Sequence, residues 1–90
     1  MTTYTYTIET SDDDVACAEP SKIWVPETTG TEQDDSTPVQ YARDVIYAYL
    51  DERERSVDYD VKVIVWEGTT SDTESMASAV VYAPGGGRAE

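Results

Sequence analysis

The segment YDVKVIVWE, residues 59–67, is the most regular part of the chain, and its architecture can be worked out from there. The segment is rich in β-branched and aromatic residues, and every second one is apolar, which predicts a β-strand. Alternation places Tyr59, Val61, Val63 and Val65 on one face. It places Lys62, Ile64 and Trp66 on the other. Because both faces carry large side chains, we expect this strand to lie at the centre of a sheet.

The residues that follow predict a hairpin. Gly68 to Ser75 is a polar connection, and Met76 to Ala83 is expected to return as a fourth, antiparallel strand. Pro84 cannot continue a strand ladder, and the three glycines after it lose much entropy on ordering. We therefore expect one domain over residues 1–84 and a flexible tail over 85–90.

A helix is predicted before the central strand. Thr37-Pro38-Val39-Gln40 combines a capping hydroxyl, a proline at the first helical position and a glutamine three residues after the cap. The apolar residues that follow share one stripe at helical spacing and should pack on the sheet. They are Val39, Ala42, Val45, Ile46, Tyr49 and Leu50.

The first part of the chain predicts two strands and a loop. Tyr4 to Glu9 alternates apolar residues with threonine, as in a half-buried strand. A second strand is expected between Ala16 and Pro26, with Lys22 to Val25 as its best-supported part. Glu27 to Ser36 has no periodicity and predicts an exposed loop.

These elements predict an α+β fold, a four-stranded antiparallel sheet of order β-β-α-β-β along the chain with one helix on one face. The first half of the chain resembles HicB-type antitoxins. Tyr4 to Glu9 matches their opening strand and Thr37 to Leu50 their helix, whereas their glycine-rich connection is missing. The resemblance covers about half of the chain and implies an antitoxin-like role, although a shared arrangement does not define a function.

The charge of the protein restricts its partners. Nineteen acidic and six basic residues give a net charge of −13. Nucleic acids and anionic membranes bind proteins mainly through lysine and arginine, so neither is expected as a direct ligand. The charge leaves basic proteins, cations or no specific partner, and of these a basic protein is the expected partner. The absence of a signal pattern or an apolar span predicts a cytoplasmic location, which would be the host cytoplasm for a viral protein.

The residues present also restrict the chemistry. The 90-residue chain has no histidine, the commonest general base and metal ligand, and only one cysteine, Cys17. The acidic runs Asp12–Asp14 and Asp34–Asp35 lack the alternate carboxylates and the glycine of the common calcium loop. We therefore expect no enzyme activity, no cofactor and no metal site.

Aromatic residues mark one candidate contact surface. If the helix covers the face that carries Val61, Val63 and Val65, the opposite face is left with large apolar side chains. Those assigned to it are Trp24, Ile64, Trp66 and Tyr82. Two alternatives stand equally: the face is exposed and binds a partner or a second copy of the chain, or a loop covers it. In the exposed case Trp24 and Trp66 should lie together.

Three explanations remain for the acidity. The protein could be a nucleic-acid mimic whose carboxylates occupy the basic groove of a nucleic-acid-binding protein, which as a class resembles the anti-restriction and anti-CRISPR proteins of phages and mobile elements. It could be adapted to a high-salt cytoplasm. It could be a structural, virion-associated or antitoxin-like protein that oligomerises through the aromatic face. A mimic requires acids on one side, and the candidates are Asp12, Asp13, Asp14, Glu32, Asp34, Asp35, Asp44, Asp51, Glu52 and Glu54.

Overall fold

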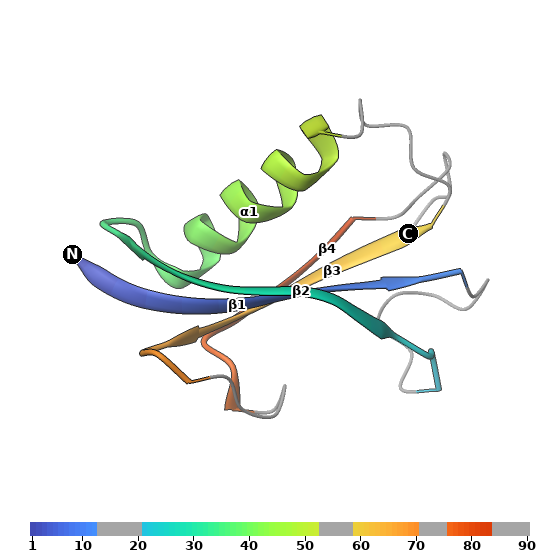
Figure 1. Ribbon diagram of the computed structural model, residues 1–90, viewed down its shortest axis with the longest axis horizontal. Coiled ribbons are helices and arrows are strands. Elements are labelled where there is room, and N and C mark those ends of the chain that lie inside the picture. Colours follow the sequence, from blue (N-terminus) through green and yellow to red (C-terminus); the bar gives the residue numbers. More distant parts are fainter. Residues whose placement is uncertain (13–20, 53–58, 71–75, 84–90) are drawn as a thin grey trace.

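A computed structural model describes residues 1–12, 21–52, 59–70 and 76–83. It has four strands and one helix in the order β1, β2, α1, β3, β4 (Figure 1). The bounds of the strands are Thr2–Ser11 for β1, Val25–Asp34 for β2, Asp60–Glu67 for β3 and Ala79–Ala83 for β4. The helix α1 runs from Pro38 to Glu52. The predicted α+β class, with four antiparallel strands and one helix, is confirmed.

The strand order in the sheet is β2-β1-β3-β4, and every neighbouring pair is antiparallel. The segment at residues 59–67 therefore lies in the interior of the sheet, and its hairpin with β4 is confirmed. Because β2 and β3 both run opposite to β1, they run in the same direction with β1 between them. The helix joins them and covers one face of the sheet (Figure 1).

The core lies between α1 and the face of the sheet that carries Val61, Val63 and Val65, all three fully buried. Tyr4 and Ile8 of β1 extend this apolar layer. The helix makes most of its sheet contacts with β3 and β4 and few with β1. It is therefore displaced from the β2 edge, which leaves the helix side of β2 open.

The predicted cap is present at the start of α1. The Gln40 backbone N–H donates to the Thr37 hydroxyl at 3.3 Å, and the Tyr41 N–H donates to the Thr37 carbonyl. Most of the predicted stripe packs on the core, but Val39 is exposed and Tyr41 is buried in its place. The Tyr41 ring stacks on Tyr4 with centroids 4.8 Å apart, which fixes this end of the helix on β1.

The second strand lies further along the chain than predicted. Residues 22–24 are not in a strand, whereas β2 occupies most of the segment for which a loop was expected. Its residues are exposed or half-buried throughout. Because neither face of the strand is buried, its residues need not alternate between apolar and polar. The strand forms because it pairs with β1 along its length, including two threonine pairs, Thr5 with Thr31 and Thr7 with Thr29.

Candidate functional site

The sheet face opposite the helix is not an open aromatic surface. Ile64 is 4% exposed and Trp66 is 6% exposed, so the alternative in which these two side chains are free to bind a partner was wrong. Trp24 and Tyr82 also belong to this face and are half-buried. The ring of Trp24 contacts that of Tyr82, with centroids 5.9 Å apart.

Residues 22–24 attach to this outer face through charged contacts. Lys22 forms an ion pair of 2.7 Å with Asp60, and both side chains are fully buried. Lys62 pairs with Glu9 at 3.0 Å, and its ammonium lies 4.7 Å from the centre of the Trp24 ring. Each lysine is thus matched by a carboxylate on the same face. The arrangement is typical of a structural cluster, because its charges are paired and removed from water.

The other carboxylates of the strands lie on the helix side of the sheet. Glu32 and Asp34 pair with Tyr4 and Thr2 of β1, and the alternation of side chains puts both on the helix side. By the same alternation, Glu67 at the end of β3 lies on that side. Among the described strand residues, the only carboxylates on the outer face are those of Glu9 and Asp60, and each of these pairs with a lysine.

A β-bulge adds one more carboxylate to the helix side. Ile8 pairs with Thr28 and Glu9 pairs with Pro26, so the register passes over Glu27. Regular alternation would turn Glu27 to the outer face, but its carboxylate accepts a hydrogen bond of 2.7 Å from the Tyr49 hydroxyl of α1. Bulges commonly re-aim a side chain in this way.

Two tyrosines of the helix hold β2 carboxylates in place. Tyr41 donates to Glu32 at 2.7 Å, as Tyr49 does to Glu27, and the Tyr49 hydroxyl also contacts that of Tyr59 at 2.9 Å. Burial, followed by the hydrogen bond to Glu32, raises the pKa of Tyr41. Burial, followed by hydrogen bonds to Tyr59 and Glu27, raises the pKa of Tyr49. Both hydroxyls therefore stay protonated and able to donate at neutral pH.

A groove of about 190 Å³ lies between α1 and β2. Its apolar lining comes from Ile8, Val45 and Ala48, and its carboxylates are Glu32 of β2 and Glu52 of α1. We call this the acidic groove. Asp44, Ala48 and Glu52 are spaced four residues apart, so Asp44 lies on the same row of the helix. Asp51 lies three residues after Ala48, beside that row.

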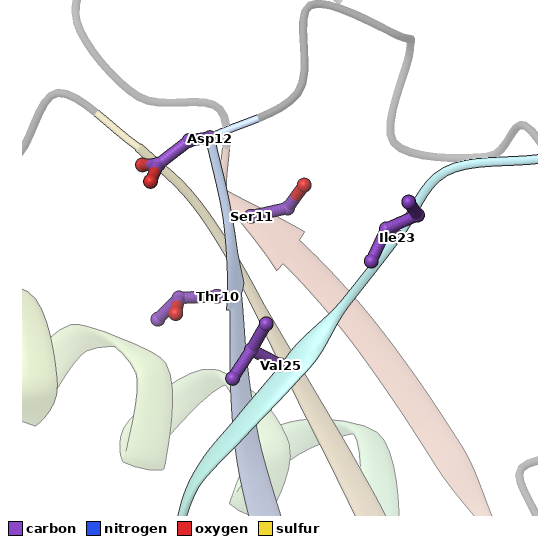
Figure 2. Close-up of a pocket in the computed structure, with 5 residues that line it drawn as sticks. All are labelled: Thr10, Ser11, Asp12, Ile23 and Val25. Atoms are coloured by element: carbon purple, nitrogen blue, oxygen red, sulfur yellow. The ribbon is translucent and has the colours of Figure 1, made fainter.

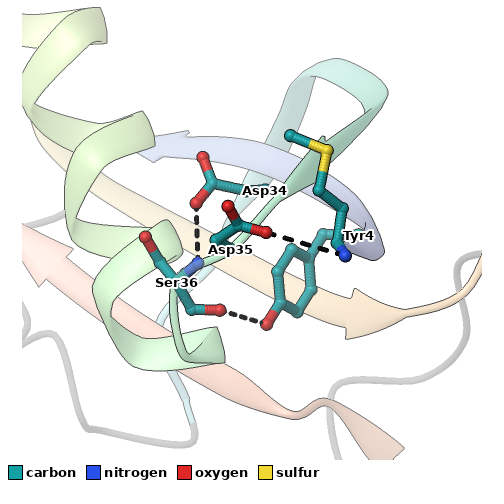
Figure 3. A network of polar contacts seen from close by, with 5 residues as sticks. Tyr4, Asp34, Asp35 and Ser36 are labelled. Carbon is teal, nitrogen blue, oxygen red and sulfur yellow. Dashed lines mark hydrogen bonds and ion pairs between the residues drawn. The ribbon is translucent and has the colours of Figure 1, made fainter.

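The turn from β2 into α1 is held by polar contacts (Figure 3). The Ser36 N–H donates to Asp34 at 2.8 Å, and the Tyr4 hydroxyl donates to the Ser36 carbonyl at 2.6 Å. Hydrogen bonding from the Ser36 side chain, together with its backbone, holds the pKa of Asp34 below its usual value. The exposed Asp35 lies 3.6 Å from the terminal ammonium. These contacts fix the angle between β2 and the helix.

A second cavity, of about 420 Å³, lies where β1 ends and β2 begins (Figure 2). Among the described residues that line it, the apolar ones are Ile23 and Val25, both largely exposed, and the charged one is Asp12. Asp12 therefore lies apart from the acidic groove. Of the other predicted acids, Asp13, Asp14 and Glu54 lie outside the described residues.

The structure thus brings together part of the predicted acidic set, Glu32, Asp34, Asp44, Asp51 and Glu52, along β2 and α1. It adds Glu27, for which the sequence holds no signal, since a bulge has no signature in this stretch. Across the described parts of the chain, no group of three metal-binding side chains lies close enough to hold an ion. No helix in those parts is long and apolar enough to cross a membrane.

Comparison of the chain with protein-family models, with curated proteins and with solved structures finds no match. The resemblance to HicB-type antitoxins therefore stays a prediction.

Proposed function

We propose that this protein is a non-enzymatic acidic interaction protein that binds a basic nucleic-acid-binding protein, with carboxylates standing in for phosphates. Its class would be that of the anti-restriction and anti-CRISPR inhibitors of phages and mobile elements. The observation that carries the proposal is the one-sided distribution of largely exposed acids over the described part of the chain. They gather on β2, on α1 and in the turn between them.

The basic residues reinforce this asymmetry. Of the three described lysines and arginines, Lys22 and Lys62 are buried against carboxylates of the outer face, and Arg43 of the helix is exposed. Lysine is thus used to neutralise the outer face and not to balance the acidic groove. Adaptation to high salt would instead distribute acids over both faces, and oligomerisation through the aromatic face would need Ile64 and Trp66 to be accessible.

The acidic groove is also held in a fixed geometry, which favours recognition. Tyr41 orients Glu32 and Tyr49 orients Glu27 through hydrogen bonds from neutral hydroxyls, which leave the negative charge of each carboxylate in place. Preorganised carboxylates lose little side-chain entropy when a partner binds. A strong one-sided potential also speeds the encounter with a basic partner, most of all at low ionic strength.

Capture from nuclease-treated host lysate, followed by elution with duplex DNA or with RNA, tests the proposal. We expect the immobilised protein to retain a basic nucleic-acid-binding protein that either salt or the matching nucleic acid releases. The variant Glu32→Gln/Glu52→Gln should lose this capture. Its control, Asp12→Asn/Glu67→Gln, removes the same charge away from the groove and should keep it.

Three outcomes would contradict the proposal. The first is the absence of any captured basic protein at low salt. The second is a captured protein that excess nucleic acid does not release, because a mimic and the nucleic acid that it imitates would compete for one groove. The third is an equal loss of capture in both double variants, which would mean that total charge and not the acidic groove is recognised.

A further inference from the structure

The free edge of β2 is the longest open hydrogen-bonding surface in the described structure. This ten-residue strand pairs with β1 on one side, and no described strand pairs with the other. The opposite edge of the sheet is β4, which has five residues. Open edges of this length are sites where an extended segment can add as a further strand.

Only part of β2 is regular enough to accept a strand. Pro26 lacks an N–H group and Glu27 is bulged, and both features discourage pairing at the beginning of the strand. From Thr28 to Asp34 the register with β1 is unbroken. Along this part, Glu32 and Asp34 face the helix side, and Thr29 and Thr31 face the outer side.

The charges of the edge select its occupant. A second copy of the chain would bring Glu32 and Asp34 close to their own counterparts, which like-charge repulsion opposes. A basic segment would instead be attracted by these two carboxylates. We infer that the edge of β2 from Thr28 to Asp34 binds an extended basic segment of the partner as an added strand, with lysine or arginine at alternate positions facing the acidic groove. This inference rests on the proposed function.

The surface beside β2 fits long cationic side chains. Gly30 has no side chain, and the space above it is taken by the ring of Tyr6, which would lie within 2.7 Å of an added Cβ. A guanidinium that crosses β2 at this point meets the ring of Tyr6, and aromatic rings can attract cations. In the acidic groove beside this ring, Ile8 and Val45 can contact the alkyl stem of such a side chain, and Glu32 can bind its charged end.

Peptides of one composition can test the inference without altering the protein. A peptide that alternates arginine with threonine is compared with its block isomer, in which all arginines precede all threonines. Two further forms of the alternating peptide carry N-methyl groups, one at the odd and one at the even positions. Affinity is measured by fluorescence anisotropy at low salt, and backbone amide exchange of β2 is followed in the complex.

We expect the alternating peptide to bind about tenfold more tightly than its block isomer. Only one of the two N-methylated forms should lose affinity, because alternate N–H groups of a strand point to opposite sides. Between Thr28 and Asp34, the alternate amides that point away from β1 should become protected from exchange. The variant Glu32→Gln/Glu52→Gln should bind the alternating peptide more weakly than Asp12→Asn/Glu67→Gln does.

Equal binding of all four peptides would overturn the added strand but leave the proposed function intact, because affinity would then follow charge alone. Failure of every peptide to bind, with salt-sensitive capture of a basic protein retained, would also overturn this inference alone. Loss of both would overturn both. Doubling of the protein's mass at micromolar concentration, with β2 protected, would show that a second copy occupies the edge.

Discussion

Gly30 shows how one residue without a side chain allows β1 and β2 to pack. A Cβ at this position would lie 2.6 Å from the Tyr6 hydroxyl oxygen and 2.7 Å from two ring carbons. We expect Gly30→Ala to cost about 1–3 kcal/mol of unfolding free energy, because the ring must move from its place. Urea unfolding measures this cost. In a Tyr6→Val background the same substitution should be close to neutral, so an equal cost in both backgrounds would contradict the explanation.

A second prediction for single residues concerns the contribution of the buried ion pair between Lys22 and Asp60 to stability. Removing either charge leaves the other buried without its ion-pair partner, which typically costs about 3–5 kcal/mol. We expect Lys22→Met and Asp60→Asn each to show a loss of this size in urea unfolding. The double variant removes both charges and should lose less than the sum of the two. Additive losses would mean that the two groups do not depend on each other.

At the scale of elements, the hydrogen bonds that two tyrosines of α1 donate to carboxylates of β2 predict that stability depends on pH. Free tyrosine ionises near pH 10, but burial raises the pKa of Tyr41 and Tyr49 in the folded protein. Above about pH 10 the unfolded chain therefore releases protons that the folded protein retains. The free energy of unfolding should be at its full value below that pH and fall as the pH rises further.

Urea unfolding at a series of pH values between about 9 and 11.5 would measure this fall, with tyrosine absorbance reporting ionisation. The variant Tyr41→Phe/Tyr49→Phe cannot ionise at these positions, and we expect its stability to decline less steeply. A stability that stays constant across the range in the unaltered protein would contradict the prediction. So would an unchanged slope in the double variant.

The elements also show what the sequence can reveal about this fold. Strands β1 and β3 have one side against the helix, and every second residue, which lies on that side, is apolar, a two-residue period that is visible in Tyr4 to Ile8 and in Val61 to Val65. Strand β2 has no buried face, and its proline, glycine and acidic residues resemble those of a loop. Its pairing with β1 is a property of the sheet and not of the segment, which explains why a loop was predicted there.

The alternation of side chains along a strand predicts which face a residue lies on, but not what covers that face. Alternation correctly assigned Ile64 and Trp66 to the face opposite the helix, but it does not report what lies over that face. The ion pair between Lys22 and Asp60 joins residues 38 positions apart, and no local pattern encodes it. The acidic groove itself was not predicted: the sequence marked Glu32 and Glu52 as acidic candidates, but it placed Glu32 in a loop and did not show that β2 and α1 flank one groove.

For the whole molecule, the one-sided acids predict that salt stabilises the fold. A net charge of −13 opposes compaction, and two ion pairs, those of Lys22 with Asp60 and of Lys62 with Glu9, are largely buried, so salt screens them little. Screening lengths fall from about 30 Å at 0.01 M salt to about 10 Å at 0.1 M, so repulsion between neighbouring acids is reduced over this range. The free energy of unfolding should therefore rise with sodium chloride up to a few tenths molar.

The distribution of the charge, and not only its sum, should govern the size of this effect. Glu32→Gln/Glu52→Gln removes two acids from the acidic groove, whereas Asp12→Asn/Glu67→Gln removes two from outside it. We expect the first variant to be the more stable at 0.01 M salt and to respond less to added salt, because both of the acids that it removes line one groove. Equal responses would indicate that the acids act only as a total charge. A stability that falls with salt would mean that ion pairs, and not repulsion, dominate the electrostatics of the fold.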